Sequence, residues 1–299
     1  MSRIDEALKR AAMGGGPARD AVDASILDRY DSEEPQQIRE PQRIREPQPS
    51  AVVVAPRPGR GNQFRRLERV TDGKLVVSGK MSAMSVEEYG RLAATLHAVQ
   101  AQRNIKTLMV TSALPRDGKT LTVTNLALTL SEAYGRRVLL IDADLRRPSI
   151  HAVLDLPNAT GLGDALRADR APLGFIEVSP TLTVLPAGQS DKSPVAGLTS
   201  SRMKTILDEA AERFDWVLVD SPPVAVLSDA KLMAGQVDGV LMVIAAGQTP
   251  YPYIQRAIAE LGPERIIGVV LNRAANHAIS GNGYYQDYYH STRGGADHG

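Results

Sequence analysis

A lysine and a hydroxyl residue, Lys119 and Thr120, close a short loop that lies between an apolar run and a helix-like run. The loop, residues 113–120 (ALPRDGKT), follows the apolar residues 108–110. Such a loop between a strand and a helix binds phosphate, because backbone N–H groups and the helix N-terminus point at the anion while the lysine adds a positive charge. The pattern G-x-x-x-x-G-K-[ST] is met except at its first position, which is Ala113. We call residues 113–120 the phosphate loop.

Two later apolar runs end in carboxylates. Residues 138–141 lead into Asp142 and Asp144, and residues 216–219 lead into Asp220. Such runs are typical of buried parallel strands, whose carboxyl ends form the ligand-binding edge of an open sheet. Carboxylates beside a polyphosphate would repel it unless a hard cation such as Mg²⁺ lies between them. Each Asp alone could instead cap a helix, but the three motifs together predict a nucleotide site.

Composition excludes several classes of protein. The chain has 299 residues, no cysteine and a formal net charge of +1. Without cysteine there are neither disulfides nor thiolate metal sites, and the near-neutral charge gives no electrostatic case for a nucleic-acid partner. The sequence has no apolar run of about 18 residues and no secretory signal at its start, so we expect a cytoplasmic protein without a membrane-spanning helix.

Helical and strand patterns alternate around these motifs. Strands are predicted near 106–111, 138–142, 182–186, 216–220, 240–244 and 266–271, and helices near 86–99, 119–134, 201–214, 228–234 and 253–261. Strands that are apolar throughout and separated by helices indicate a parallel sheet covered on both faces. We therefore predict an α/β fold of the P-loop NTPase class, with a mostly parallel, doubly wound sheet.

The two ends of the chain differ from its middle. Residues 1–13 have the period of a short amphipathic helix, and the Pro-, Gln- and Arg-rich residues 14–74 predict a disordered linker. We expect one domain at 75–281 and a flexible tail at 282–299. Four of the nine tyrosines fall in this tail, at Tyr284, Tyr285, Tyr288 and Tyr289. No apolar period there would bury them, so they form either an adhesive surface or a set of hydroxyls offered to an active site.

Together these motifs resemble those of the bacterial tyrosine autokinases, or BY-kinases, that control capsule and exopolysaccharide export. The resemblance covers about residues 75–290 and rests on the G-K-T loop, the D-x-D-L-R-R-P and D-S-P-P sequences and the terminal tyrosine cluster. The first eight residues, MSRIDEAL, resemble soluble members found beside exosortase-linked polysaccharide systems. The resemblance implies ATP and Mg²⁺ as cofactors and phosphotyrosine as the product.

The resemblance also implies a role for each residue of the site. The nucleotide would be held by Pro115, Arg116, Asp117, Gly118, Lys119, Thr120 and Leu121, with Asn272 near the adenine unless it merely caps a turn. The metal would be held by Thr120, Asp142 and Asp220. Either Asp142 or Asp144 would accept the proton of the incoming tyrosine. Arg146 or Arg147 would steady the transferred phosphoryl group, unless it pairs with a nearby carboxylate. The phosphoacceptors would be Tyr284, Tyr285, Tyr288 and Tyr289.

Partners follow from the same resemblance. Members of the family form rings in which the tail of one subunit enters the site of its neighbour, so we expect a homo-oligomer and phosphoryl transfer in trans. Their ring contacts use E-x-x-R-x-x-R on an early helix; here Glu88 and Arg91 are present, but Ala94 replaces the second arginine, which predicts a weaker or altered ring. A separate membrane chain-length regulator would be the activator and would place this chain at the inner membrane.

Other functions stay open at this point. A nucleotide-switch ATPase of the partitioning or division-site type shares the fold, but its loop has an early lysine, K-G-G-x-G-K-T, where this chain has Leu114. A non-catalytic nucleotide-binding regulator of polysaccharide synthesis is the third reading. Asn272-Arg273 lacks the aspartate of an N-K-x-D motif, which favours ATP over GTP.

Overall fold

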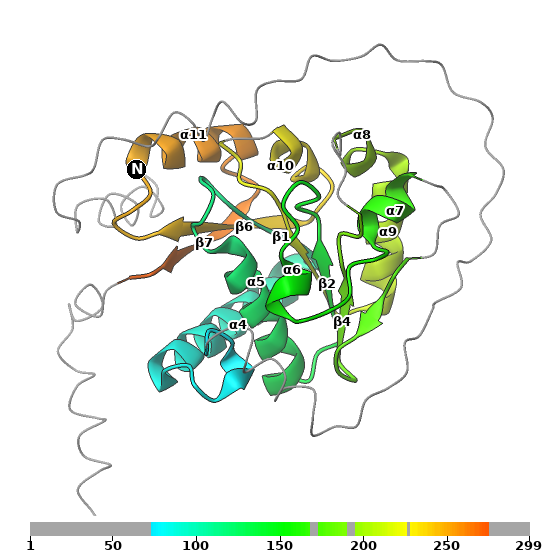
Figure 1. Ribbon diagram of the computed structural model, residues 1–299. Helices are drawn as coiled ribbons and strands as arrows, with labels where there is room; N and C mark the ends of the chain where they lie inside the picture. Colours follow the sequence, from blue (N-terminus) through cyan, green and yellow to red (C-terminus); the bar gives the residue numbers. More distant parts are fainter. Residues whose placement is uncertain (1–72, 168–172, 190–194, 226–227, 275–299) are drawn as a thin grey trace, which may run out of the picture.

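The computed structural model describes residues 73–167, 173–189, 195–225 and 228–274. They form a seven-stranded sheet in the order β3-β4-β2-β5-β1-β6-β7 (Figure 1). All neighbouring strands are parallel except β3 and β4. Helices cover both faces of the sheet, as Figure 1 shows. The predicted α/β P-loop architecture is therefore confirmed.

Most predicted elements agree with the observed ones to within a few residues. The strands are β1 Thr107–Ser112, β2 Val138–Asp142, β3 Ile176–Glu177, β4 Leu182–Leu185, β5 Trp216–Asp220, β6 Gly239–Ala245 and β7 Ile266–Asn272. The α-helices are α4 Ala83–Arg103, α5 Lys119–Leu128, α6 Ile150–Val153, α7 Leu162–Arg167, α8 Val195–Leu198, α9 Ser201–Arg213, α10 Ser228–Met233 and α11 Tyr251–Leu261. A 3₁₀ turn, η1 Val76–Ser78, precedes α4, and a π-helical turn, η2 Thr129–Ala133, continues α5. The sequence did not predict β3, α6, α7, α8 or η1.

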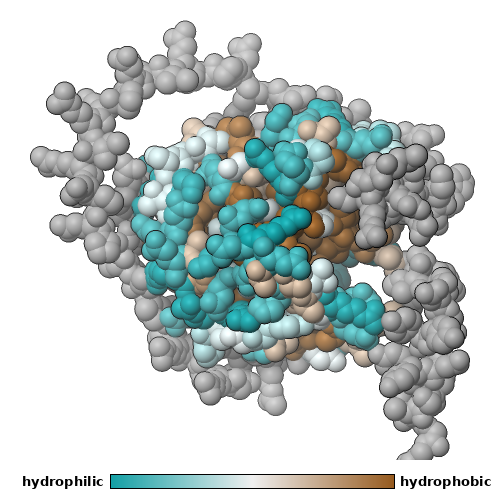
Figure 2. Space-filling model, turned by 180° about the vertical axis from the view of Figure 1, so that it is seen from behind, coloured by the Kyte–Doolittle hydropathy of each residue, from teal (hydrophilic) through white to brown (hydrophobic). Residues whose placement is uncertain are grey.

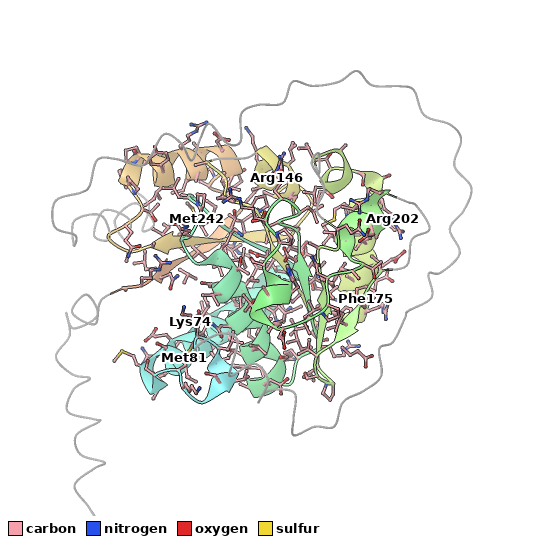
Figure 3. The ribbon with its side chains drawn as sticks, viewed as in Figure 1. Lys74, Met81, Arg146, Phe175, Arg202 and Met242 are labelled. Carbon is pink, nitrogen blue, oxygen red and sulfur yellow. The ribbon has the colours of Figure 1, made fainter. Side chains whose placement is uncertain are left out.

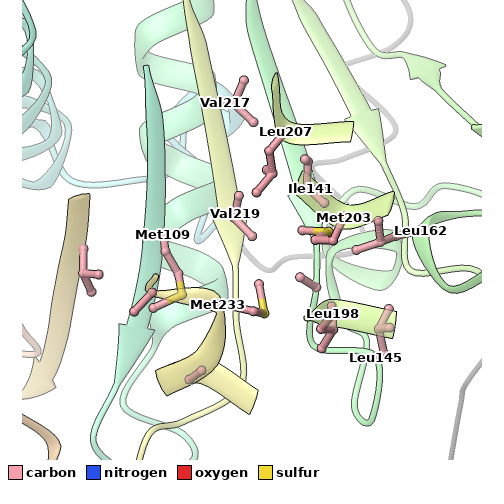
Figure 4. Packing of buried hydrophobic residues seen from close by; sticks show 14 of the residues in the cluster. Met109, Ile141, Leu145, Leu162, Leu198, Met203, Leu207, Val217, Val219 and Met233 are labelled. Carbon is pink, nitrogen blue, oxygen red and sulfur yellow. The ribbon is translucent and has the colours of Figure 1, made fainter. Parts of the chain in front are cut away.

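Alternate residues of each central strand enter two separate hydrophobic cores. On one face, Met109 and Val219 pack with Met203 and Leu207 of α9 and with residues of α10 and α11 (Figure 4). On the other face, strand residues that include the fully buried Trp216 pack against α4 and α5. Full burial of one aliphatic side chain such as Val219 stabilises the fold by roughly 1.5–3 kcal/mol. The central strands are therefore rigid supports for the loops at their carboxyl ends.

Side-chain caps begin the two longest helices in the described part of the chain. Ser82 accepts a hydrogen bond from the backbone N–H of Ser85 at the start of α4, and Ser200 accepts one from Met203 at the start of α9. Helix α4 is followed by its C-cap residue Asn104, whose φ of 53° is left-handed, as is usual at a helix C-terminus.

Among the described residues, no helix has the length and apolar character needed to cross a membrane.

The described part begins at the end of the predicted linker. Asn125 of α5 holds this segment from inside the domain: its side chain donates to the carbonyl of Lys74 at 2.9 Å and accepts from the N–H of Val76 at 2.9 Å. The predicted N-terminal helix, the linker up to residue 72 and the tyrosine tail lie outside the described residues.

Seen from behind, the described surface is mostly hydrophilic, with narrower hydrophobic areas between the polar ones (Figure 2).

Candidate active site

The three motifs found in the sequence meet at the carboxyl ends of three adjacent strands. Strand β5 lies between β1 and β2, with Asp220 opposite Asp142 in one register and opposite Val110 in the other. The phosphate loop leaves the end of β1 and leads into α5, whose first residue is Lys119. The sheet therefore brings the loop, the D-x-D sequence and Asp220 to one edge, as the strand pattern predicted.

Two residues of the phosphate loop have left-handed backbone, Arg116 with φ 71° and Gly118 with φ 100°. Asp117 lies between them and is buried, with a side chain that points back into the protein. Its carboxylate accepts from the N–H of Leu114 at 3.0 Å and from the hydroxyl of Thr249 at 2.8 Å. Burial raises the pKa of Asp117, and these hydrogen bonds oppose that rise. Its side chain therefore fixes the loop shape, which leaves only its backbone to face a phosphate.

Lys119 lies among the carboxylates at the strand ends. Its Nζ is 2.9 Å from Oδ2 of Asp144 and 3.5 Å from Oδ1 of Asp220. Burial alone would lower the pKa of Lys119, but the charges of Asp220 and Asp144 outweigh burial and raise it. The ammonium group is therefore positively charged at any physiological pH and is held where a phosphate would enter.

Thr120 and Asp220 provide two oxygens suited to a magnesium ion. The Thr120 hydroxyl donates to Oδ2 of Asp220 at 2.6 Å and accepts from the hydroxyl of Ser149 at 3.2 Å. Asp220 is fully buried, and its Oδ1 accepts no hydrogen bond. Burial raises the pKa of Asp220 most strongly, while Lys119 opposes that rise. A buried carboxylate oxygen that accepts no hydrogen bond and faces only the Lys119 ammonium at 3.5 Å suits a cation, and the metal site of Thr120, Asp142 and Asp220 stays a prediction.

The carboxylate of Asp142 accepts hydrogen bonds from backbone groups and feels the charges of neighbouring carboxylates. Its Oδ2 accepts from the N–H groups of Ser149 and Ile150, each at 3.0 Å, at the start of α6. Burial, followed by the charge of Asp220, raises the pKa of Asp142 to about 7. Such a pKa suits a general base near neutral pH. Asp142 thus accepts the N–H groups at the start of α6, a cap that the sequence suggested for Asp144 and Asp220 instead, and its raised pKa suits a proton acceptor.

The raised pKa of Asp142 predicts a pH-dependent effect on stability. Because the folded pKa lies above the ordinary value of 3.8, the folded protein retains a proton that the unfolded chain loses, so this group's stabilisation falls as pH rises through about 7. Asp142→Asn is neutral throughout. We expect the melting temperature of this variant minus that of the wild type, measured in EDTA, to increase from about pH 5.5 to about pH 8.

The control for this titration is Asp208→Asn, which neutralises an exposed carboxylate on α9. Its difference in melting temperature should stay flat over the same range. A difference for Asp142→Asn that does not change with pH would contradict a raised pKa at this site. A pH-independent cost from imperfect hydrogen bonding of the amide does not affect the comparison, since only the slope is tested.

Arg146 and Arg147 follow the D-x-D sequence but lie differently. Arg146 points toward α10 (Figure 3), where its Nε donates to Oδ2 of the buried Asp229 at 3.0 Å. The sequence left open whether this arginine binds phosphate or forms an ion pair with a carboxylate. In the structure it forms an ion pair with the carboxylate of Asp229. Arg147 is exposed and lines the pocket beside the phosphate loop. Of the two arginines, Arg147 is the one that borders the space for a nucleotide.

An open pocket of about 390 Å³ lies over the phosphate loop. Its lining is Pro115, Arg116, Gly118, Lys119, Thr120, Leu121, Asp144, Arg147, Ser149, Val153, Pro223 and Arg273. Ser149, Val153, Pro223 and Arg273 were not predicted from the sequence as site residues. Ser149 follows D-x-D-L-R-R-P directly, so its place beside that motif was the available signal. Among the described residues, no group of three or more acidic or histidine side chains is arranged as a metal site by itself.

Asn272 lies at the end of β7 beside the phosphate loop. Its side-chain amide donates to the backbone carbonyl of Asp117 at 2.8 Å.

On α4, Arg91 pairs with Glu88 at 3.1 Å and with Glu87 at 2.5 Å, so the predicted ring-contact residues are bound to each other within one helix. The four tail tyrosines lie outside the described residues, and their relation to the pocket stays a prediction.

Comparisons with known proteins show which family the chain resembles. The family model described as the CobQ/CobB/MinD/ParA nucleotide binding domain matches residues 108–289. The tyrosine-protein kinase YwqD of Bacillus subtilis (strain 168) is 30% identical over 236 residues, which cover 78% of this chain and 96% of YwqD. The succinoglycan biosynthesis transport protein ExoP of Rhizobium meliloti (strain 1021) is 30% identical over 232 residues, 75% of this chain and 28% of ExoP. The kinase domain of Escherichia coli tyrosine kinase ETK superimposes with a TM-score of 0.59 and 29% identity, covering 64% of this chain and 78% of that domain.

Proposed function

The chain belongs to the bacterial tyrosine-protein kinases, within the CobQ/CobB/MinD/ParA nucleotide-binding family, and from this premise we propose that it transfers the γ-phosphoryl group of ATP to its own C-terminal tyrosines. One observation carries the proposal: at the start of α5, Nζ of Lys119 lies 2.9 Å from Asp144 and 3.5 Å from Asp220, and the Thr120 hydroxyl lies 2.6 Å from Asp220. The acceptors in this proposal are Tyr284, Tyr285, Tyr288 and Tyr289.

The phosphates of ATP would lie against the backbone N–H groups of the phosphate loop and the start of α5. Lys119 would exchange its contact with Asp144 for the β- and γ-phosphates. Thr120 and Asp220, with Asp142, are the residues that would hold Mg²⁺, which supplies charge neutralisation to the phosphates when bound. The residues of the site fit this ion because the Thr120 hydroxyl and the buried Asp220 carboxylate are already in contact.

Proton transfer from the acceptor would fall to Asp142 or Asp144. The tyrosine oxygen attacks the γ-phosphorus, its proton goes to the carboxylate, and the bond from the γ-phosphorus to the bridging oxygen breaks to release ADP. Asp144 would become free for this role once Lys119 leaves it for phosphate. Because the transition state is loose, positioning and charge neutralisation supply most of the rate, and a modest base is sufficient.

A role in polysaccharide export is supported by the name of one relative. ExoP is a succinoglycan biosynthesis transport protein, and this chain matches 28% of its length. We propose that tyrosine phosphorylation here regulates polysaccharide polymerisation or export. A separate membrane chain-length regulator would be the activator, and this chain would lie at the inner membrane through it. We further propose a homo-oligomer in which the tail of one subunit enters the site of the next.

The kinase reaction is tested by giving purified full-length protein ATP and Mg²⁺ and measuring phosphotyrosine and released inorganic phosphate in parallel. We expect phosphotyrosine to accumulate, and to be lost when EDTA removes the metal. Release of inorganic phosphate without phosphotyrosine would support the nucleotide-switch ATPase instead. The absence of both products would support the non-catalytic regulator.

A further inference from the structure

The backbone carbonyls of the phosphate loop need hydrogen-bond donors. A loop that turns its N–H groups toward an anion turns carbonyl groups to the opposite side. Carbonyls inside a protein are almost always paired, which applies to the part-buried hydrogen bond at Asp117, whereas the bond at Arg116 is exposed. The left-handed backbone at Arg116 and Gly118 is typical of such a nest of N–H groups. The donors that pair the carbonyls behind the nest therefore control its shape.

Two residues that are distant in the sequence supply these donors. The side-chain amide of Asn272 donates to the carbonyl of Asp117 at 2.8 Å, and Nη2 of Arg273 donates to the carbonyl of Arg116 at 2.9 Å. Both lie at the end of β7, 155 and 157 residues from the groups they hold. A Cβ built on Gly118 would lie 2.0 Å from Nδ2 of Asn272. Glycine at this position thus permits the close approach of the amide.

Arg273 is itself held in place. Its backbone is left-handed with φ 59°, its N–H donates to Oδ1 of Asn272 at 2.9 Å, and its Nη1 donates to Oε1 of Gln248 at 2.7 Å. The planar guanidinium therefore bridges the phosphate loop and the turn after β6. A lysine could not reproduce both contacts with the same geometry, because its ammonium group is a single point of charge.

We propose that Asn272 and Arg273 form a clamp that positions the phosphate loop, so that they set the affinity for the polyphosphate group and not the choice of base. The inference deepens the proposed function and rests on it. Asn272 then acts through the loop backbone, in place of the adenine contact expected from the family resemblance. Arg273, which also lines the pocket, acts in this proposal through the carbonyl of Arg116 and is a positioning residue.

Inorganic tripolyphosphate separates the two roles of Asn272, because it has phosphates but no base. We would measure displacement of a fluorescent ADP analogue by ATP, GTP and tripolyphosphate from full-length wild type, Asn272→Leu and Arg273→Leu. We expect Asn272→Leu to weaken all three ligands by about tenfold, and Arg273→Leu by roughly threefold, as expected for lost hydrogen bonds to a loop. Arg273→Lys should recover only part of the loss.

The matched control is Arg265→Leu, which removes the same charge from an exposed arginine just before β7 and should leave all affinities unchanged. The clamp is overturned if Asn272→Leu weakens ATP but leaves tripolyphosphate at its wild-type affinity, or if Arg273→Lys restores full binding. Melting temperatures without ligand show whether each variant is folded, and Arg273→Leu keeps the test informative if Asn272→Leu is not. Failure of the proposed function appears separately, as wild-type protein that does not bind the analogue or form phosphotyrosine.

Discussion

Replacement of Lys119 by methionine is expected to lower the rate of phosphotyrosine formation by at least about a hundredfold. The methionine keeps much of the side-chain volume but removes the ammonium group that lies 2.9 Å from Asp144. Without that charge, the carboxylates of Asp142, Asp144 and Asp220 would repel the triphosphate. The effect is measured as the initial rate of phosphotyrosine formation with ATP and Mg²⁺.

The control for this change is Lys231→Met, which removes the same charge from an exposed position on α10. We expect its rate to equal that of the wild type. Circular dichroism and melting temperature establish that Lys119→Met is folded, since it leaves buried carboxylates without their cation. A folded Lys119→Met protein with more than a tenth of the wild-type rate would contradict the role given to this lysine.

Transfer between molecules is expected to restore labelling when two inactive variants are mixed. The first variant is Lys119→Met, which keeps the tail tyrosines but lacks the phosphate-binding lysine. The second carries phenylalanine at positions 284, 285, 288 and 289, so that it keeps the site but lacks the predicted acceptors. Alone, each should form almost no phosphotyrosine. Together, the Lys119→Met chain should become labelled, because the intact site of its partner receives its tail.

A size tag on one variant shows which chain is labelled after gel separation. The rate of labelling should increase with total protein concentration, since the two chains must meet. Wild-type protein labelled at a concentration-independent rate, combined with no labelling in the mixture, would show transfer within one molecule. Strong labelling of the phenylalanine variant alone would instead place the acceptor elsewhere in the chain.

The sheet and its ligand-binding edge could be predicted from the sequence because the strands are apolar throughout. The predicted strands at 138–142 and 216–220 have the bounds observed for β2 and β5, and their terminal aspartates lie opposite each other in the sheet. Buried parallel strands carry a continuous apolar signal. The meeting of the phosphate loop with these carboxylates follows from the rule that ligands bind at the carboxyl ends of parallel strands.

Pairings between distant segments could not be predicted in the same way. The partner of Arg146 is Asp229, 83 residues further along, and neither residue has a local pattern that reveals the other. Asp117 looks like a nucleotide-facing residue in the sequence, yet its carboxylate holds the loop from inside through Leu114 and Thr249. Helices α6 and α8 have four residues each, too few to show a hydrophobic period.

Mapping of phosphotyrosine by mass spectrometry in wild-type protein treated with ATP and Mg²⁺ tests the central claim most directly. The nine tyrosines of the chain include Tyr89, Tyr134, Tyr251 and Tyr253 in the folded part, which serve as internal controls. The account predicts phosphate on Tyr284, Tyr285, Tyr288 or Tyr289 and little on these four. Phosphate found mainly on tyrosines of the folded part, or on none, would contradict it.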